Sequence, residues 1–212
     1  MKHFSFLLLC GALTMPAAHA QLAISAPVTT VSAPVTSVPT RTLSKSEYKA
    51  QLKAADATLQ TTPKDVEALL SRAQAHVELK DYPEAVADYN TLLRLQPANV
   101  EWYYLRGTAR LRAEEFQPAM ADFTKALKYD AKHKPSMLYR GVARMKATNY
   151  KGAITDFSQI IVQDPENADA YEYRGVCYSL AGQDALAVKD LEKAAALNPA
   201  AAKTLKRYRP GK

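Results

Sequence analysis

The sequence is poor in cysteine, histidine and glycine, on which many catalytic, metal-binding and nucleotide-binding sites depend. Its 212 residues include two cysteines, four histidines and seven glycines. The glycine-rich GxGxxG and P-loop motifs are absent, as are the HExxH and CxxC motifs of metal and redox sites. We therefore expect no enzymatic activity, no cofactor and no metal site. With 48% apolar and 23% charged residues, the composition is nevertheless that of a folded domain.

The sequence also lacks a long apolar segment. The apolar stretch from Phe4 to Leu13 has roughly ten residues, whereas a membrane-spanning helix needs about 20. Lys2 precedes it, and the small-x-small sequence Ala18-His19-Ala20 follows it. This order is typical of a secretory signal peptide. We predict a signal peptide over residues 1–20, cleavage after Ala20, and export across the inner membrane to the periplasm.

Cleavage at this site would leave a chain with one cysteine. Lipidation of Cys10 is the alternative fate of the N-terminus, but Leu9 is not the small residue that a lipoprotein signal places before its cysteine. The remaining Cys177 has no partner for an intramolecular disulfide. Packing must then stabilise the fold even in an oxidising compartment.

Residues 21–42 form a segment of different composition, rich in proline, threonine and valine. The sequence Ser-Ala-Pro-Val-Thr occurs at residues 25–29 and again at 32–36. Its prolines each remove a donor that a β-strand would need, so we predict a flexible, extended linker. The linker could hold the folded part away from a surface, or it could be a tail without a role.

From residue 66 onward the sequence repeats itself at a constant period. Four copies align without a gap, and each contains an arginine, an alanine and an aspartate at fixed places. A proline ends three of the copies, and Ala131 replaces it in the second. The recurring residues are Arg72, Arg106, Arg140 and Arg174; Ala85, Ala119, Ala153 and Ala187; Asp88, Asp122, Asp156 and Asp190; and Pro97, Pro165 and Pro199.

Within a repeat, apolar residues recur at spacings of three and four, as in Ala85, Tyr89 and Leu92, which is the pattern of an amphipathic helix. With this period and these small, aromatic and proline positions, the segment resembles tetratricopeptide repeats, which are helix–turn–helix units of about 34 residues. The resemblance implies an all-α superhelical solenoid of helix–turn–helix units. We place the four repeats at 66–99, 100–133, 134–167 and 168–199.

Small residues recur on the first predicted helix of each repeat. Glycine costs about 1 kcal/mol relative to alanine inside a helix. We expect Gly107, Gly141 and Gly175 to offset this cost by close approach of the partner helix at Ala119, Ala153 and Ala187. Cys177 aligns with alanines in the other repeats, which favours a buried and unreactive thiol. These alanines are Ala75, Ala109 and Ala143.

The repeated arginines and aspartates could be read as a charged recognition strip. However, each arginine precedes its aspartate by the same interval, which places the two on different helices of one repeat. We predict an ion pair that fixes each helix pair. The pairs are Arg72–Asp88, Arg106–Asp122, Arg140–Asp156 and Arg174–Asp190.

The two ends of the repeat array are predicted to carry additional helices. Residues 43–65 contain a helix that begins with a capping box at Ser44 and Glu47, and Pro63 stands one repeat period before Pro97. This segment resembles the second half of a degenerate repeat. Residues 200–212 form a basic C-terminal capping helix and tail, because solenoids need polar caps at their ends.

The positive net charge of +7 is not spread along the repeats. The charged residues of 66–199 sum to −1, and the tail carries +5 from Lys203, Lys206, Arg207, Arg209 and Lys212. A nucleic-acid groove would concentrate basic residues along the array, so we expect no nucleic-acid partner. The tail could be a solvated cap, or it could contact an anionic envelope surface.

In the tetratricopeptide repeat family, the first helix of each repeat lines a concave groove that binds partner segments. Transferred to this sequence, the resemblance implies a groove that is apolar at its centre, suited to an amphipathic or extended segment of a protein or peptide partner. One subclass binds the C-terminal carboxylate of chaperones through Lys, Asn and Arg, but Leu70, Gln74, Pro135 and Tyr139 stand at those positions here. The predicted partner-binding residues are Leu70, Gln74, Val77, Tyr104, Thr108, Leu111, Arg112, Leu138, Val142, Met145, Lys146, Glu172 and Val176.

These observations predict a non-enzymatic protein–protein interaction scaffold or adaptor. The alternative is a structural or self-associating envelope protein, either a homo-oligomer formed through the same groove or a protein held at an anionic surface by its basic tail.

Overall fold

The computed structural model describes residues 43–208, and this part of the chain is built from helices alone. The signal peptide predicted at 1–20, the linker predicted at 21–42 and tail residues 209–212 lie outside the described residues.

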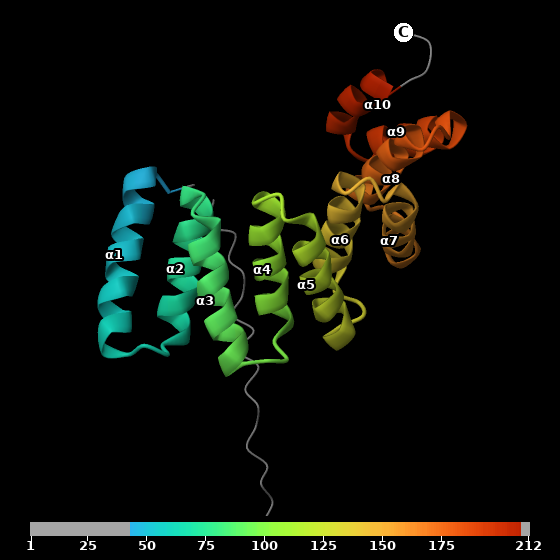
Figure 1. Ribbon diagram of the computed structural model, residues 1–212. Coiled ribbons are helices and arrows are strands. Elements are labelled where there is room, and N and C mark those ends of the chain that lie inside the picture. Colours follow the sequence, from blue (N-terminus) through green and yellow to red (C-terminus); the bar gives the residue numbers. More distant parts are fainter. Residues whose placement is uncertain (1–42, 209–212) are drawn as a thin grey trace, which may run out of the picture. The chain divides into compact units, whose positions relative to one another are not determined.

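Each helix packs against the next one in the sequence, and Figure 1 shows this order from α1 to α10. Two helices correspond to each predicted repeat, starting with α2 and α3. The helices are α1 (Lys45–Thr61), α2 (Val66–Leu79), α3 (Tyr82–Leu95), α4 (Val100–Arg112), α5 (Phe116–Tyr129), α6 (Lys134–Lys146), α7 (Tyr150–Gln163), α8 (Ala168–Leu180), α9 (Asp184–Leu197) and α10 (Ala202–Tyr208), with a 3-10 turn η1 (Pro199–Ala201) before α10.

Side chains of the sequence set the starts of these helices. Ser44 and Glu47 form the expected capping box at α1: the Ser44 amide donates to the Glu47 carboxylate at 2.6 Å. Asp65 and Asn167 accept backbone N–H groups at the starts of α2 and α8. Because these caps satisfy donors that a helix leaves free, they fix where each helix begins.

The turn inside each repeat contains one residue with a positive φ. These residues are Lys80, Glu114, Thr148 and Gly182, which occupy the same place in the four repeats and have φ between 62° and 73°. Only the last is a glycine, the residue that adopts this conformation without steric cost. Thr148 is β-branched, so its left-handed backbone is strained.

The glycines of the first helices lie against a large apolar side chain, which is an aromatic ring at Gly107 and Gly141, rather than against the small residue that we expected. A Cβ atom added at Gly107 would lie 2.8 Å from the Phe123 ring, and one at Gly141 would lie 2.6 Å from Phe157. At Gly175 the nearest atom belongs to Leu191, and the Ala187 carbonyl follows at 3.2 Å. The missing side chain therefore makes room mainly for the residue that follows the repeated aspartate.

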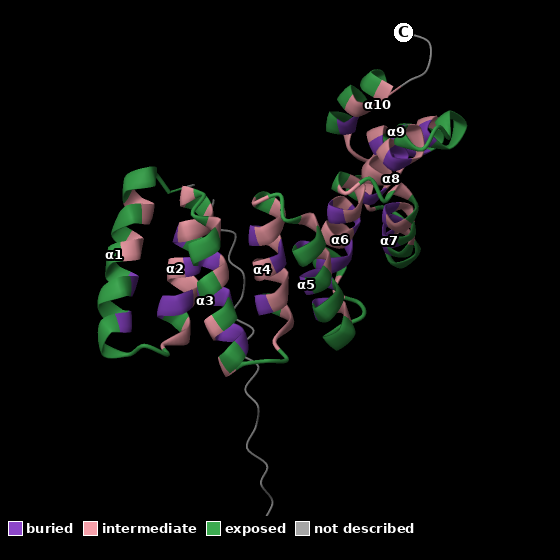
Figure 2. Cartoon of the chain, in the orientation of Figure 1, coloured by how far each residue is buried: buried purple, intermediate pink, exposed green. Residues whose placement is uncertain are grey.

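The core is a strip of small and large apolar residues between successive helices, coloured purple in Figure 2. Tyr89, Phe123, Phe157 and Leu191 occupy equivalent places in the four repeats, and each is at most 1% exposed. No helix in residues 43–208 is both long and apolar enough to cross a membrane.

Candidate functional site

From the second repeat onward, the first helices of successive repeats approach one another. α4 contacts α6, α6 contacts α8, and α8 contacts α10. Within residues 43–208 the second helices, α3, α5, α7 and α9, make no comparable contacts with each other. In a curved row of helix pairs, the helices that meet lie on the inside of the curve. We refer to the surface of α2, α4, α6 and α8 as the inner face.

The residues predicted to bind a partner all lie on these four helices, and none of them is buried. The apolar ones pack one side against the core and leave the other side accessible. Leu70 and Val77 border the core of the first repeat, and Tyr104 and Leu111 border that of the second. Farther along are Leu138, Val142 and Met145. The inner face thus carries a row of half-buried apolar side chains.

A cavity of about 300 Å³ lies on this row. Two predicted partner-binding residues, Tyr104 and Leu138, share its wall. Of the other lining residues, Lys134, Pro135 and Tyr139 lie on α6 with Leu138, Ile160 lies on α7, and Asn167 precedes α8. The full lining is Tyr104, Lys134, Pro135, Leu138, Tyr139, Ile160 and Asn167.

Aromatic rings hold the wall of this cavity in place. The Tyr104 ring meets the edge of Tyr139, with centroids 5.8 Å apart, and lies 5.5 Å from the His133 ring. Tyr139 stacks on the buried Phe123 at 6.2 Å. Burial raises the pKa of Tyr104, so its hydroxyl stays neutral at physiological pH. Tyr104 and Tyr139 therefore give the cavity an aromatic side, which suits apolar ligands.

Some predicted partner-binding residues are engaged within the chain. Arg112 donates to Glu78 at 2.9 Å and so joins α4 to α2 across the inner face. Thr108 donates to the backbone carbonyl of Tyr104 at 2.9 Å. Glu172 accepts a 2.6 Å hydrogen bond from Thr204 of α10. The C-terminal helix α10 thus hydrogen-bonds to Glu172, while Gln74 and Lys146 remain exposed on the surface.

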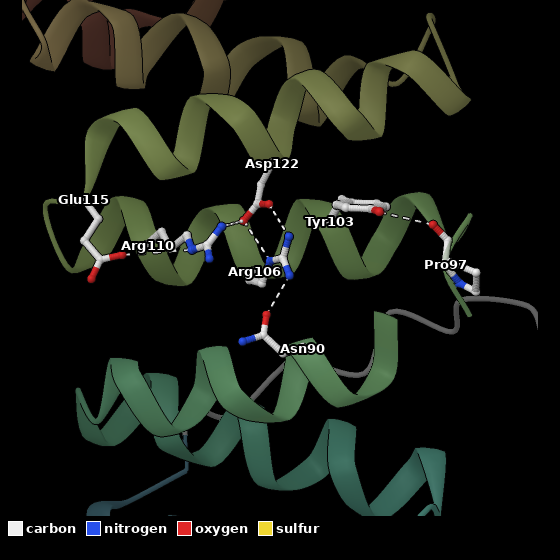
Figure 3. A network of polar contacts seen from close by, with 7 residues as sticks. All are labelled: Asn90, Pro97, Tyr103, Arg106, Arg110, Glu115 and Asp122. Atoms are coloured by element: carbon white, nitrogen blue, oxygen red, sulfur yellow. Dashed lines mark hydrogen bonds and ion pairs between the residues drawn. The ribbon is translucent and has the colours of Figure 1, made fainter. Parts of the chain in front are cut away.

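The structure brings every repeated arginine to its aspartate, as Figure 3 shows for Arg106 and Asp122. The guanidinium donates through two nitrogens to both oxygens of the carboxylate, which is a bidentate pair. The Nε–Oδ2 distances are 3.0 Å for Arg72–Asp88, 3.0 Å for Arg106–Asp122, 3.1 Å for Arg140–Asp156 and 2.7 Å for Arg174–Asp190. The hydrogen bond to the aspartate raises the pKa of Arg72 and of Arg174.

The third nitrogen of each arginine reaches the second helix of the preceding repeat. In Figure 3, Arg106 donates from Nη1 to Asn90 at 2.6 Å. The corresponding acceptors of the other three arginines are Asp56 on α1, Thr124 on α5 and Ser158 on α7. Each arginine therefore connects three helices, and the array contains a continuous polar ladder.

Two central repeats add a second arginine to the buried carboxylate. Arg110 donates to Asp122 at 2.7 Å, and Arg144 lies 2.8 Å from Asp156. His76 stands at the equivalent place in the first repeat. Its Nδ1 is buried without a hydrogen-bond partner, 3.7 Å from a carboxylate oxygen of Asp81.

The remaining chemistry-bearing residues form no further site within residues 43–208. Cys177 is fully buried, and burial raises the pKa of its thiol to about 12. In the described part of the chain, no group of three or more His, Cys, Asp or Glu side chains is placed to hold a metal ion.

The repeat geometry and the sequence identify the family. A model of the tetratricopeptide repeat family matches residues 46–100, 70–136 and 138–202, well over half of the chain. The chain belongs to the tetratricopeptide repeat family. Among curated proteins, none matches this sequence.

Solved tetratricopeptide repeat structures share the fold. The crystal structure of MamA is 23% identical with a TM-score of 0.68, over 75% of this chain and 93% of that one. YrrB, described as a TPR protein with an unusual peptide-binding site, is 22% identical with a TM-score of 0.66, over 76% and 84%. A tetratricopeptide repeat protein from Parabacteroides merdae is 25% identical with a TM-score of 0.62, over 77% and 69%.

Proposed function

We propose that this protein is a non-enzymatic scaffold that binds a segment of a partner protein along its inner face. The observation that carries the proposal is the cavity between Tyr104 and Leu138 within a row of half-buried apolar side chains. Rigid helix pairs hold these side chains in place, so the repeat array itself loses little conformational entropy when a partner binds. Apolar pockets along such a face can read alternate side chains of an extended segment or one side of an amphipathic helix.

Family membership and the described peptide-binding site of YrrB support this assignment. We further propose that the protein works in the periplasm after cleavage at Ala20, and that its partner is a protein or peptide rather than a nucleic acid. Self-association through the inner face is the competing use of the same surface.

The C-terminal helix supports a second candidate role, attachment to an anionic envelope surface. Lys203, Lys206 and Arg207 on α10 are exposed. Deleting residues 203–212 would release the protein from envelope fractions if the tail holds it there, and moderate salt would have the same effect.

In-cell photo-crosslinking tests the scaffold proposal. A photoreactive residue is placed at Tyr104 or at Met145, with Lys125, an exposed residue of the second helix α5, as the control. A discrete adduct from both inner-face sites, absent at Lys125, is the expected result, and mass spectrometry names the partner. Adducts with a second copy of this chain would indicate self-association instead, and equal adducts at all three sites would refute groove binding.

A further inference from the structure

Two exposed carboxylates, Glu101 and Asp169, stand close in the sequence to residues that line the cavity, although neither belongs to the lining. Glu101 lies one turn before Tyr104 on α4, so both side chains project from the same side of that helix. Asp169 is at the start of α8, two residues after the lining residue Asn167.

The one cation among the described residues that line the cavity is already neutralised. Lys134 donates to Asp164 at 3.2 Å, and this hydrogen bond lowers the pKa of the Asp164 carboxyl. The ion pair ties the start of α6 to the loop before α8, so Lys134 already has an anionic partner other than Glu101 and Asp169.

Both carboxylates act on the tyrosines of this face. Burial is the main cause of the raised pKa of Tyr104, and the negative charge of Glu101 adds to it. The raised pKa of Tyr173 likewise comes first from burial and then from Asp169. Each carboxylate therefore lies within electrostatic range of an aromatic side chain on the inner face.

We propose that the partner segment is cationic: an apolar or aromatic side chain fills the cavity between Tyr104 and Leu138, and lysine or arginine residues beside it pair with Glu101 and Asp169. This inference rests on the proposed function and specifies its ligand. It runs opposite to the carboxylate-binding subclass, because Leu70, Gln74 and Pro135 provide no cation for an acidic terminus. Charge complementarity of this kind adds specificity and speeds association.

Fluorescence anisotropy with three sets of labelled nonapeptides tests the proposal on the full mature chain. Every peptide carries one central leucine or tyrosine, flanked on each side by four lysines or arginines, by four serines, or by four glutamates. The cationic set is expected to bind at least tenfold more tightly than the serine set, and the acidic set more weakly than either. Raising the salt concentration should reduce this preference, because salt screens exposed charges.

Neutral variants identify the carboxylates responsible. Glu101→Gln combined with Asp169→Asn should weaken binding of the cationic set about fivefold to tenfold, and leave the serine set unchanged. Glu84→Gln combined with Asp184→Asn changes the net charge equally, at exposed positions on the second helices α3 and α9 that do not line the cavity, and should have a smaller effect.

The outcomes separate this inference from the proposed function. If serine or acidic peptides bind as tightly as cationic ones, and Leu138→Gln abolishes that binding, the inner face binds peptides but the cationic preference is wrong. If cationic peptides bind equally well to the chain with Leu138→Gln, which removes the apolar contact without adding a charge, the cavity takes no part, and both the inference and the proposed function fail.

Discussion

Asp122 accepts hydrogen bonds from both Arg106 and Arg110, although its side chain is only 2% exposed. A buried carboxylate is tolerated because two guanidinium groups compensate its charge and satisfy its lone pairs. The constant interval between arginine and aspartate in every repeat predicted the first of these arginines. It did not reveal Arg110, because the equivalent places in the other repeats hold His76, Arg144 and Tyr178, which share no single residue type.

Asp122→Ala is expected to lower the free energy of unfolding by about 3 kcal/mol, because it leaves two partly buried guanidinium groups without their anion. Urea denaturation followed by circular dichroism measures the effect. The exposed Glu166→Ala serves as the control and should change stability by no more than about 0.5 kcal/mol. An equally small change for Asp122→Ala would show that the ion pair does not fix the helix pair.

Cys177 provides a test of burial at alkaline pH. Burial raises its pKa to about 12, whereas the unfolded chain loses this proton near pH 8.5. Between these values the unfolded state binds fewer protons, so the stability of the protein falls as pH rises. Cys177→Ala copies the buried alanines of the other repeats. Between pH 9 and 11 its stability should fall less steeply than that of the wild type, by about 1.4 kcal/mol per pH unit. Equal slopes for the two proteins would contradict a buried thiol.

Among the helices, the repeat period accounts for every pair from α2 to α9, and the capping box predicts the start of α1. The period does not predict the turn conformations. Lys80, Glu114 and Thr148 adopt the same positive φ as Gly182, although none of them is a glycine. Similarly, the third arginine nitrogen finds a different residue type as acceptor in each repeat. These acceptors are Asp56, Asn90, Thr124 and Ser158. When several residue types can adopt the same turn or accept the same hydrogen bond, the position shows no repeated residue from which the contact could be predicted.

Thr148→Gly is expected to stabilise the protein by about 1 kcal/mol, because it relieves a β-branched residue held in the left-handed region. The reverse change in the fourth repeat, Gly182→Thr, should destabilise by a similar amount, and the two variants form a matched pair. Thermal unfolding of both against the wild type measures the difference. Equal shifts in the same direction would show that backbone strain does not decide stability at these turns.

Across the whole array, the polar ladder and the stacked cores hold the first helices in a fixed row. The repeat pattern predicted this row and the side chains along it. It could not show that Thr204 of α10 hydrogen-bonds to Glu172. Nor could it show that Tyr104 and Tyr139 line one cavity, because the two tyrosines stand at different places in their repeats. Contacts between repeats therefore decide which parts of the inner face stay open to a partner.

The most direct test of the central claim is the yield of the Met145 photo-adduct in a chain that also carries Leu138→Glu. The glutamate puts a charge into the cavity wall at a half-buried place where the fold does not depend on a fully buried side chain. If the inner face binds the partner through this cavity, the adduct disappears while the circular dichroism spectrum stays that of the wild type. The same adduct at the same yield would show that the partner binds elsewhere.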